Sequence, residues 1–370
     1  MIHTATGHAP RAAQRPTSPG LVFYGLGATG QTILDDLLAA DVAVDLILDR
    51  GKRGQTYRDI PIKALDELAD GAIAGRRVLI GLHNHYVDVK AIDEQLRAAG
   101  AARVMTPVNL PELIDTPLRA TGYWLDRAFD DDSHAPDFAR LRARLADPAS
   151  RDLLDRILRY RRSGNLVDCP SPSLADEYAP VDLPRYAGPL RVIDCGAFTG
   201  VALHKLLSAG YTLDSFVAFE PDPDSFATLA ARTFPARERL CFPLGTWSST
   251  TQLRFASDGS MGSRLSDTGD VVIQCVAIDD VLHGQPVNLV KLDVEGAEIE
   301  TLRGMARIIR DQRPNLLLSA YHTPGHLYEI ADLVAEWDLG YRFHLRVHEY
   351  NTFGVVLYCL QDDRIEAAKA

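Results

Sequence analysis

The strongest constraint on the fold is a glycine-rich turn between a strand and a helix, which the chain carries twice. The first turn is GLGATG at 25–30, after an apolar run, and the second is GAFTG at 196–200, after another. Helical spacing and a further apolar run follow each turn, and those runs end in Asp49 and Glu220. This order makes a βαβ unit, which requires a parallel sheet with helices on both faces. The sequence therefore predicts an α/β fold with two doubly wound sheets.

Prolines and changes in periodicity divide the chain into segments. Apolar runs alternate with helical spacing up to about residue 110 and again from residue 190, whereas 168–189 contains five prolines that end any preceding helix. We predict five segments: a disordered leader at 1–18, a Rossmann-like domain at 19–110, a helical connector and linker at 111–189, a second α/β domain at 190–362 and a tail at 363–370.

The periodicity also predicts individual elements. A helix is expected at 64–68 in the first domain, and one continuous helix at 136–163, where leucines form an apolar stripe. In the second domain, 298–311 is expected to be a single helix. The last two runs, YRFHLRV and FGVVLYCL, are expected to form an antiparallel hairpin that closes the sheet.

Composition limits the partners and the compartment. The formal net charge is -11, from 50 acidic and 39 basic residues, which argues against duplex DNA or an anionic membrane as the main partner. The five cysteines are scattered with no CxxC, as in a reducing compartment, and no apolar run approaches the ~18 residues of a membrane span. The first 20 residues lack the apolar core of a secretory signal. We predict a cytoplasmic protein without nucleic-acid or membrane partners, in an undetermined oligomeric state.

The first glycine turn has the spacing of a dinucleotide site. Gly25 permits the tight turn, Gly27 lets the backbone approach a pyrophosphate, and Gly30 allows close packing of helix and strand. Asp49 follows Gly30 by 19 residues and could bind a ribose diol. We predict a second ligand site here for a nucleotide or nucleotide-sugar. The alternative is that the turn is architectural and binds nothing.

The second turn differs because an acid, Asp194, ends the strand before it. A carboxylate at that place repels a pyrophosphate but suits a locally cationic ligand, and S-adenosylmethionine carries a sulfonium, an amino group and a ribose diol. Glu220, 20 residues after Gly200, could bind both ribose hydroxyls. The alternative is an ordinary βαβ turn, which leaves two acids at the ligand-binding edge of the sheet unexplained.

These motifs resemble the FkbM family of S-adenosylmethionine-dependent methyltransferases. The resemblance covers about residues 175–360 and is carried by the segments VIDCGAFTG, AFEPDPDSF, VKLDVEGAE and LLLSAYHTPGHLYEI. It implies a class I methyltransferase fold of seven strands with a reversed terminal hairpin, and methyl transfer to a hydroxyl of a sugar or related natural product. The predicted cofactor site comprises Asp194, Gly196, Ala197, Thr199, Gly200, Glu220, Pro221, Asp222 and, on the adenine face, Trp247.

Four polar residues near the next strand ends are the catalytic candidates. Lys291 and Asp293 lie on one face of the strand VNLVKLD, and His322 ends the following strand. We predict that His322 is the general base, that Asp293 orients it or the acceptor hydroxyl, and that Glu295 is the reserve base. Alternatively, Lys291 and Asp293 form a structural ion pair, Glu295 caps a helix, and His322 is a buried loop residue. No metal is predicted, because Asp293 and His322 lack an obvious third ligand.

The sequence therefore predicts an S-adenosylmethionine-dependent O-methyltransferase acting on a small molecule or glycan. Two other classes stay open. One is a nucleotide- or NAD-dependent oxidoreductase or epimerase seated in the first domain, and the other is a non-catalytic module that senses a ligand.

Overall fold

The computed structural model describes residues 20–115, 122–126, 129, 132–256, 264–265 and 271–366. They fall into two compact units. The first comprises residues up to 82 together with 90–120, and the second comprises 83–89 together with 121 onwards. The predicted leader at 1–18 and residues 367–370 of the predicted tail lie outside the described residues.

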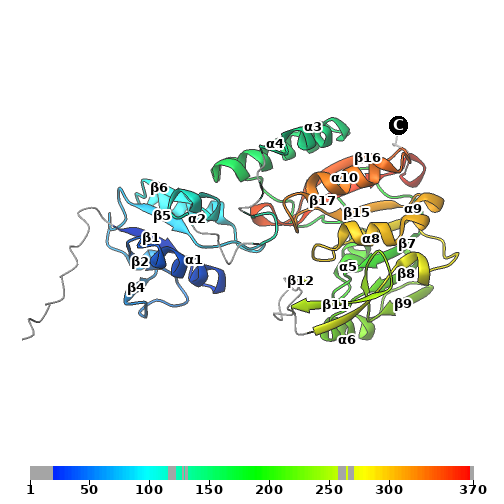
Figure 1. Ribbon diagram of the computed structural model, residues 1–370, viewed down its shortest axis with the longest axis horizontal. Coiled ribbons are helices and arrows are strands. Elements are labelled where there is room, and N and C mark those ends of the chain that lie inside the picture. Colours follow the sequence, from blue (N-terminus) through cyan, green and yellow to red (C-terminus); the bar gives the residue numbers. More distant parts are fainter. Residues whose placement is uncertain are drawn as a thin grey trace, which may run out of the picture. The chain divides into compact units, whose positions relative to one another are not determined.

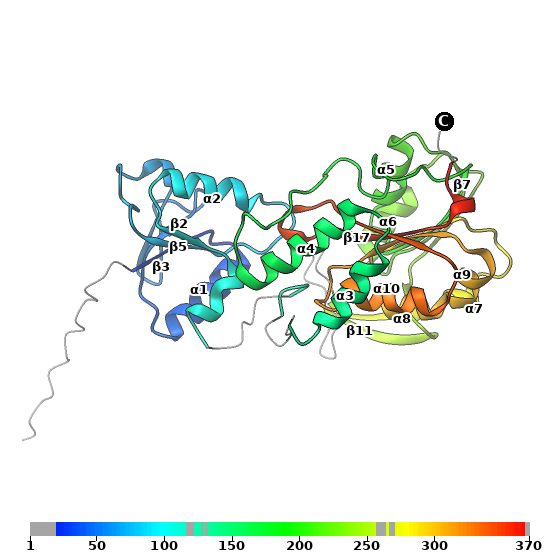
Figure 2. The ribbon, with the colours of Figure 1, turned by 90° about the horizontal axis from the view of Figure 1, so that it is seen from above.

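The first unit is built on a sheet of six described strands in the order β3-β4-β2-β1-β5-β6. All neighbours are parallel except β3 and β4, which form an antiparallel hairpin at one edge. Figure 2 shows α1 and α2 on opposite faces of this sheet, so the predicted doubly wound arrangement is confirmed. The elements are β1 Leu21–Tyr24, α1 Ala28–Ala39, β2 Val44–Leu48, β3 Thr56–Tyr57, β4 Ile60–Lys63, η1 Leu65–Glu67, β5 Arg77–Ile80, α2 Val89–Ala98, β6 Arg103–Met105 and η2 Pro107–Glu112.

The prediction of a helix at 64–68 was wrong. The structure has only the 3-10 turn η1 there, and the residues before it form the hairpin β3–β4. Ile60 and Ile62 alternate inward along β4. This period of two is too short, at four residues, to be distinguished from helical spacing in the sequence.

The second unit contains a seven-stranded sheet in the order β16-β17-β15-β14-β7-β8-β9 (Figure 1). Strands β15, β14, β7, β8 and β9 are parallel, and β17 is antiparallel to both of its neighbours. The predicted α/β fold with a reversed terminal hairpin is thus confirmed. The strands are β7 Leu190–Cys195, β8 Leu213–Phe219, β9 Glu238–Phe242, β14 Leu289–Leu292, β15 Asn315–Ser319, β16 Arg342–Val347 and β17 Val355–Leu360.

Helices cover both faces of this sheet, as Figure 2 shows for α5 and α6 on one side and α8, α9 and α10 on the other. Successive side chains of a strand point to opposite faces, so Ile193 packs in the core beneath α10, and Val192 packs in the core beneath α5. The helices are α3 Ala135–Arg144, α4 Pro148–Ser163, α5 Val201–Ser208, α6 Pro223–Ala231, α7 Ile278–Val281, α8 Glu298–Gly304, α9 Ala306–Gln312 and α10 His326–Glu336. Helices α3 and α4 also join the first of these cores.

A smaller sheet of the same unit has the order β10-β13-β11-β12. It accounts for the two extra strands that the sequence predicts at 252–256 and 271–276. Its described strands are β10 Gly245–Thr246, β11 Thr251–Ala256, β12 Arg264–Leu265 and β13 Val271–Val276.

Two predicted continuous helices are each divided in two. The helix expected at 136–163 breaks into α3 and α4, where Ala146 donates its N–H to Phe343 of β16 (2.8 Å) and Asp147 caps α4 by accepting from Ser150 N (2.8 Å). Pro148 at the first position of α4 has no N–H to continue the earlier helix. The helix expected at 298–311 breaks at Met305 into α8 and α9.

Candidate functional site

The predicted cofactor and catalytic residues gather at the carboxyl ends of the parallel strands of the second unit. Asp194 lies at the end of β7, Glu220 directly follows β8, Asp293 follows β14, and His322 comes shortly after β15. The register places Asp194 beside Lys291. This edge is where open α/β sheets bind ligands, and the structure therefore assembles from distant segments what the sequence treats as separate motifs.

The glycine turn after β7 is held against the end of β14. A Cβ at Gly196 would lie 1.8 Å from the carbonyl oxygen of Asp293, and Gly196 has a φ of +69°. The N–H groups of Gly196 and Ala197 both donate to Phe219 O of β8, at 3.0 Å. Gly200 has a φ of +83°, and a Cβ there would lie 2.5 Å from the Phe234 ring. The turn thus needs glycine at both ends for conformation and for space.

Lys291 stabilises this turn from below. Its ammonium donates to Gly196 O at 2.6 Å and lies 3.2 Å from Asp194 Oδ1, and both side chains are buried. Burial raises the pKa of the Asp194 carboxyl, against the opposing effect of the Lys291 charge. Besides that ammonium, no donor in the described part of the chain bonds the carboxylate of Asp194. The partner of Lys291 is therefore Asp194, and its position is below the cofactor turn.

Glu220 connects the glycine turn to the loop after β8. Its carboxylate accepts from Phe198 N (2.7 Å) and Asp222 N (2.8 Å), and only 6% of the residue is exposed. Burial raises the pKa of Glu220, and the two N–H groups act to lower it. Asp222, after Pro221, in turn caps α6 by accepting from Ser225 N (2.8 Å). The carboxylate is fixed beside the turn that contains Thr199.

Trp247 lies on a different element from the other predicted cofactor residues. It follows β10, donates its backbone N–H to Val276 O (2.9 Å), and its carbonyl would meet a Cβ at Gly304 of α8 at 2.0 Å. Its assignment to the adenine face stays a prediction.

Asp293 is surrounded by hydroxyl and imidazole donors. Its carboxylate accepts from Tyr178 Oη (3.3 Å) and Tyr321 Oη (3.4 Å) and lies 3.4 Å from His322 Nε2. His322 Nε2 is also 3.5 Å from Glu295, and about a quarter of each carboxylate side chain is exposed. The two catalytic acids therefore share one imidazole and keep access to a ligand.

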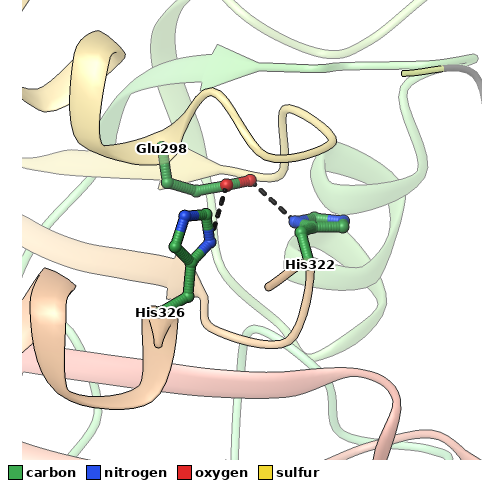
Figure 3. A group of neighbouring side chains, drawn as sticks. All are labelled: Glu298, His322 and His326. Carbon is green, nitrogen blue, oxygen red and sulfur yellow. Dashed lines mark ion pairs between the residues drawn. The ribbon is translucent and has the colours of Figure 1, made fainter. Parts of the chain in front are cut away.

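A buried carboxylate, Glu298, holds the opposite side of His322 (Figure 3). Its Oε1 lies 2.8 Å from His322 Nδ1, and its Oε2 lies 3.2 Å from His326 Nδ1. The same oxygens accept the backbone N–H groups of Val294 (2.9 Å) and Gly296 (3.1 Å). Glu298 thus links the turn after β14 to the turn after β15.

These neighbours set the charge of His322. Burial acts to lower its pKa, but Glu298, Glu295 and Asp293 outweigh that effect and raise the pKa to about 10. The pKa of Glu298 is held well below its usual range, since the effect of its burial is outweighed by the two histidines. The pKa of Glu295 is raised to about 8, chiefly by burial. At neutral pH His322 is therefore an imidazolium, which can donate a proton but cannot accept one.

Glu298, His322 and His326 are also the one group in the described ranges with the spacing of metal ligands, because one donor atom from each lies within 4.8 Å of the others. Both oxygens of Glu298 already accept a backbone N–H and face an imidazole. An ion pair between carboxylate and imidazolium satisfies all of these contacts without a cation.

The residues predicted to bind a nucleotide at the first turn lie together in the first unit. Gly25 has a φ of +88°, a Cβ at Gly30 would lie 2.1 Å from Gly25 O, and Gly27 has open space around its Cα. Asp49, however, accepts from Leu26 N (2.7 Å), Gly51 N (2.9 Å) and Lys52 N (3.1 Å). Its carboxylate therefore stabilises the turn itself, and the ribose role stays a prediction.

The sequence reasoning missed four residues that complete the second site: Tyr178, Tyr321, Glu298 and His326. Tyr321 is adjacent to His322, and Glu298 belongs to the quoted VEGAE segment, so their positions were available. Their roles were not, because Glu298 reads as an acid in the first turn of a helix. Tyr178 comes from the proline-rich linker, where no periodicity indicates a partner.

Comparisons with known proteins place this site in a family. Residues 194–343 match the methyltransferase FkbM domain. The hexuronic acid methyltransferase AglP of Haloferax volcanii is 30% identical over 129 residues, which is 32% of this chain and 52% of AglP, so the match spans about half the length of that relative. The crystal structure of methyltransferase FkbM from Methylobacillus flagellatus KT superposes with a TM-score of 0.72 at 21% identity, covering 92% of this chain and 89% of the other. That likeness shows the fold.

The contact between the glycine turn and β14 predicts unequal effects of two substitutions. Gly196→Ala places a Cβ against a backbone carbonyl and should lower stability by about 3 kcal/mol or more. Gly296→Ala, the matched control, also has a positive φ (+101°) but meets no atom within 4 Å, and should cost about 1 kcal/mol. Thermal unfolding followed by circular dichroism compares the two. Equal melting temperatures would contradict the described packing.

Proposed function

We propose that this chain, whose residues 194–343 make it a member of the FkbM methyltransferase family, transfers a methyl group from S-adenosylmethionine to a hydroxyl oxygen of a carbohydrate. The observation that carries the proposal is the common sheet edge. Acids suited to the cofactor lie at the ends of β7 and β8, and acids suited to an acceptor hydroxyl follow β14.

The residues at the glycine turn fit S-adenosylmethionine better than a dinucleotide. Asp194 is a buried acid whose oxygens meet no described donor other than Lys291, and a ligand amino group nearby would complement it. Glu220 has two further acceptor lone pairs after its two backbone bonds, which suit a ribose diol. When bound, this cofactor supplies a methyl group activated by a positively charged sulfur.

The acceptor class rests on the relative and on the local chemistry. AglP is a hexuronic acid methyltransferase by name, and a sugar hydroxyl needs a proton acceptor before it attacks a methyl group. The turn Asp293-Val-Glu295-Gly296 has no proline or aromatic residue to stack on a nucleobase. These features favour hydroxyl oxygen over a base nitrogen.

Charge decides which side chain takes the proton. His322, the predicted base, is protonated at neutral pH because three carboxylates surround it. We therefore assign the base to Glu295, the reserve candidate, with Asp293 accepting a hydrogen bond from the acceptor. As the acceptor oxygen bonds to the methyl carbon and the sulfur–methyl bond breaks, the hydroxyl proton moves to the Glu295 carboxylate. His322 stays positively charged behind both acids and orients them.

The direct test is methyl transfer by the full chain. With tritium-labelled S-adenosylmethionine and a panel of p-nitrophenyl hexosides and hexuronides, we expect label in at least one glycoside. Mass spectrometry should show the methyl group on oxygen. Label in none of them, or turnover of NAD instead, would reject the proposal.

The cofactor role of Glu220 predicts weaker binding after its removal. Glu220→Ala should raise the dissociation constant of S-adenosylhomocysteine about 10- to 100-fold, since a charged acceptor of hydrogen bonds is lost. Isothermal titration calorimetry measures the change. The matched control is Glu238→Ala, which removes an exposed glutamate from β9 and should leave the affinity unchanged. Equal affinities in both variants would refute the role.

The raised pKa of Glu295 predicts the pH dependence. A carboxyl with a pKa of about 8 is roughly one-tenth ionised at pH 7, and its basic form grows as the pH rises. The turnover rate should therefore increase about tenfold from pH 7 to pH 9. Glu295→Gln should slow transfer at least 100-fold and abolish that rise. A wild-type rate that is flat over this range would contradict the assignment.

A further inference from the structure

A short segment between the strands of the first unit belongs to the second unit. Strand β5 ends at Ile80, and residues 83–89 pack with the methyltransferase unit before α2 continues in the first. The sequence analysis gave this segment, His83-Asn84-His85-Tyr86, no function. Its attachment is therefore examined by its contacts inside the second unit.

A specific hydrogen-bonded clamp holds the segment. Asn351 Nδ2 donates to Asn84 O (2.7 Å) and Val87 O (2.9 Å), and Tyr350 N donates to His85 O (3.1 Å). Asn351 is only 4% exposed and has a φ of +59°, an uncommon backbone conformation outside glycine. One buried amide thus satisfies two carbonyls of the segment, which fixes the backbone on both sides of His85.

The flanking His83 anchors the segment through aromatic contacts. Its ring lies 4.9 Å from the Phe353 ring and 5.2 Å from the Trp124 ring, and its Nε2 is 3.1 Å from Gly122 O. Burial lowers the pKa of His83 to about 4, so its ring packs there without charge. The role of His83 is structural.

His85 points toward the acceptor side of the site. Its ring lies 6.3 Å from Phe353, which is 6.0 Å from Tyr321, whose hydroxyl donates to Asp293. The carboxylate charges of Asp293 and Glu177 act on His85, although burial has the larger effect and lowers its pKa. A neutral imidazole has one donor and one acceptor nitrogen, the pattern that binds a hydroxyl group.

Aromatic rings line the same region. Tyr123 lies 6.1 Å from Tyr321 in a stacked arrangement and 5.0 Å from Phe353. Aromatic side chains with a few polar groups are typical of small-molecule sites. The combination of rings, Asp293 and an uncharged imidazole suits a polyhydroxylated ring.

From this geometry we infer that the segment 83–89 forms part of the acceptor-binding surface, with His85 hydrogen-bonded to a hydroxyl of the sugar next to the one that is methylated. The inference rests on the proposed function and extends it. It assigns an acceptor-binding residue to a segment far from the methyltransferase motifs in the sequence.

The test uses the full chain and a p-nitrophenyl glycoside methylated by the wild-type protein. His85→Ala should raise the KM for that glycoside about three- to tenfold and leave the affinity for S-adenosylhomocysteine unchanged, because one neutral hydrogen bond is lost. His85→Gln should recover part of the loss, because its amide also has a donor and an acceptor. Asn351→Ala, which releases the clamp, should raise the KM in the same direction.

His283→Ala is the matched control, since His283 is exposed after α7 and should not affect the KM. An unchanged KM and kcat in His85→Ala would overturn this inference while leaving the proposed function intact, because the wild-type protein would still transfer methyl groups. A wild-type protein that methylates none of the glycosides would reject both. Misfolding of Asn351→Ala would not affect the result, because the two His85 variants decide it.

Discussion

The close approach of the β7 turn to the end of β14 is the constraint on which the site depends. No Cβ fits between Gly196 and the Asp293 carbonyl, and the ammonium of Lys291 ties that turn to Asp194 at the same depth. A buried ion pair contributes little net stability, because desolvation offsets its attraction. Its effect here is geometric: it fixes the cofactor turn on one side of β14, so that Asp293 and Glu295 emerge on the other.

Charge is distributed around His322 in a way that separates two functions. Glu298 is fully buried and makes four contacts, so it has no capacity for a substrate. Asp293 and Glu295 share the other nitrogen and are partly exposed. One imidazolium thus neutralises a structural acid behind it and orients two reactive acids in front of it. The raised pKa of Glu295 follows from burial that the single positive charge only partly compensates.

Fold class and the cofactor edge were predictable from the sequence because they depend on local patterns. Strand, glycine turn and helix succeed one another within about 30 residues, and an acid at a strand end has a defined place on the sheet. Three features were not predictable. The break at Asp147 depends on β16, almost 200 residues away. The partner of Lys291 depends on strand register. The protonation of His322 depends on Glu298, whose position in the sequence indicates only a helix start.

The segment 83–89 illustrates the same limit from the other direction. Its histidines follow a strand in a Rossmann-like pattern, so sequence proximity associates them with the first glycine turn. The hydrogen bonds from Asn351 instead attach them to the second unit. Because Asp49 spends its oxygens on backbone N–H groups of its own turn, the polar groups with capacity for a ligand concentrate near Asp293. The first half of the chain therefore contributes to methyl transfer through this segment more directly than through its own glycine-rich turn.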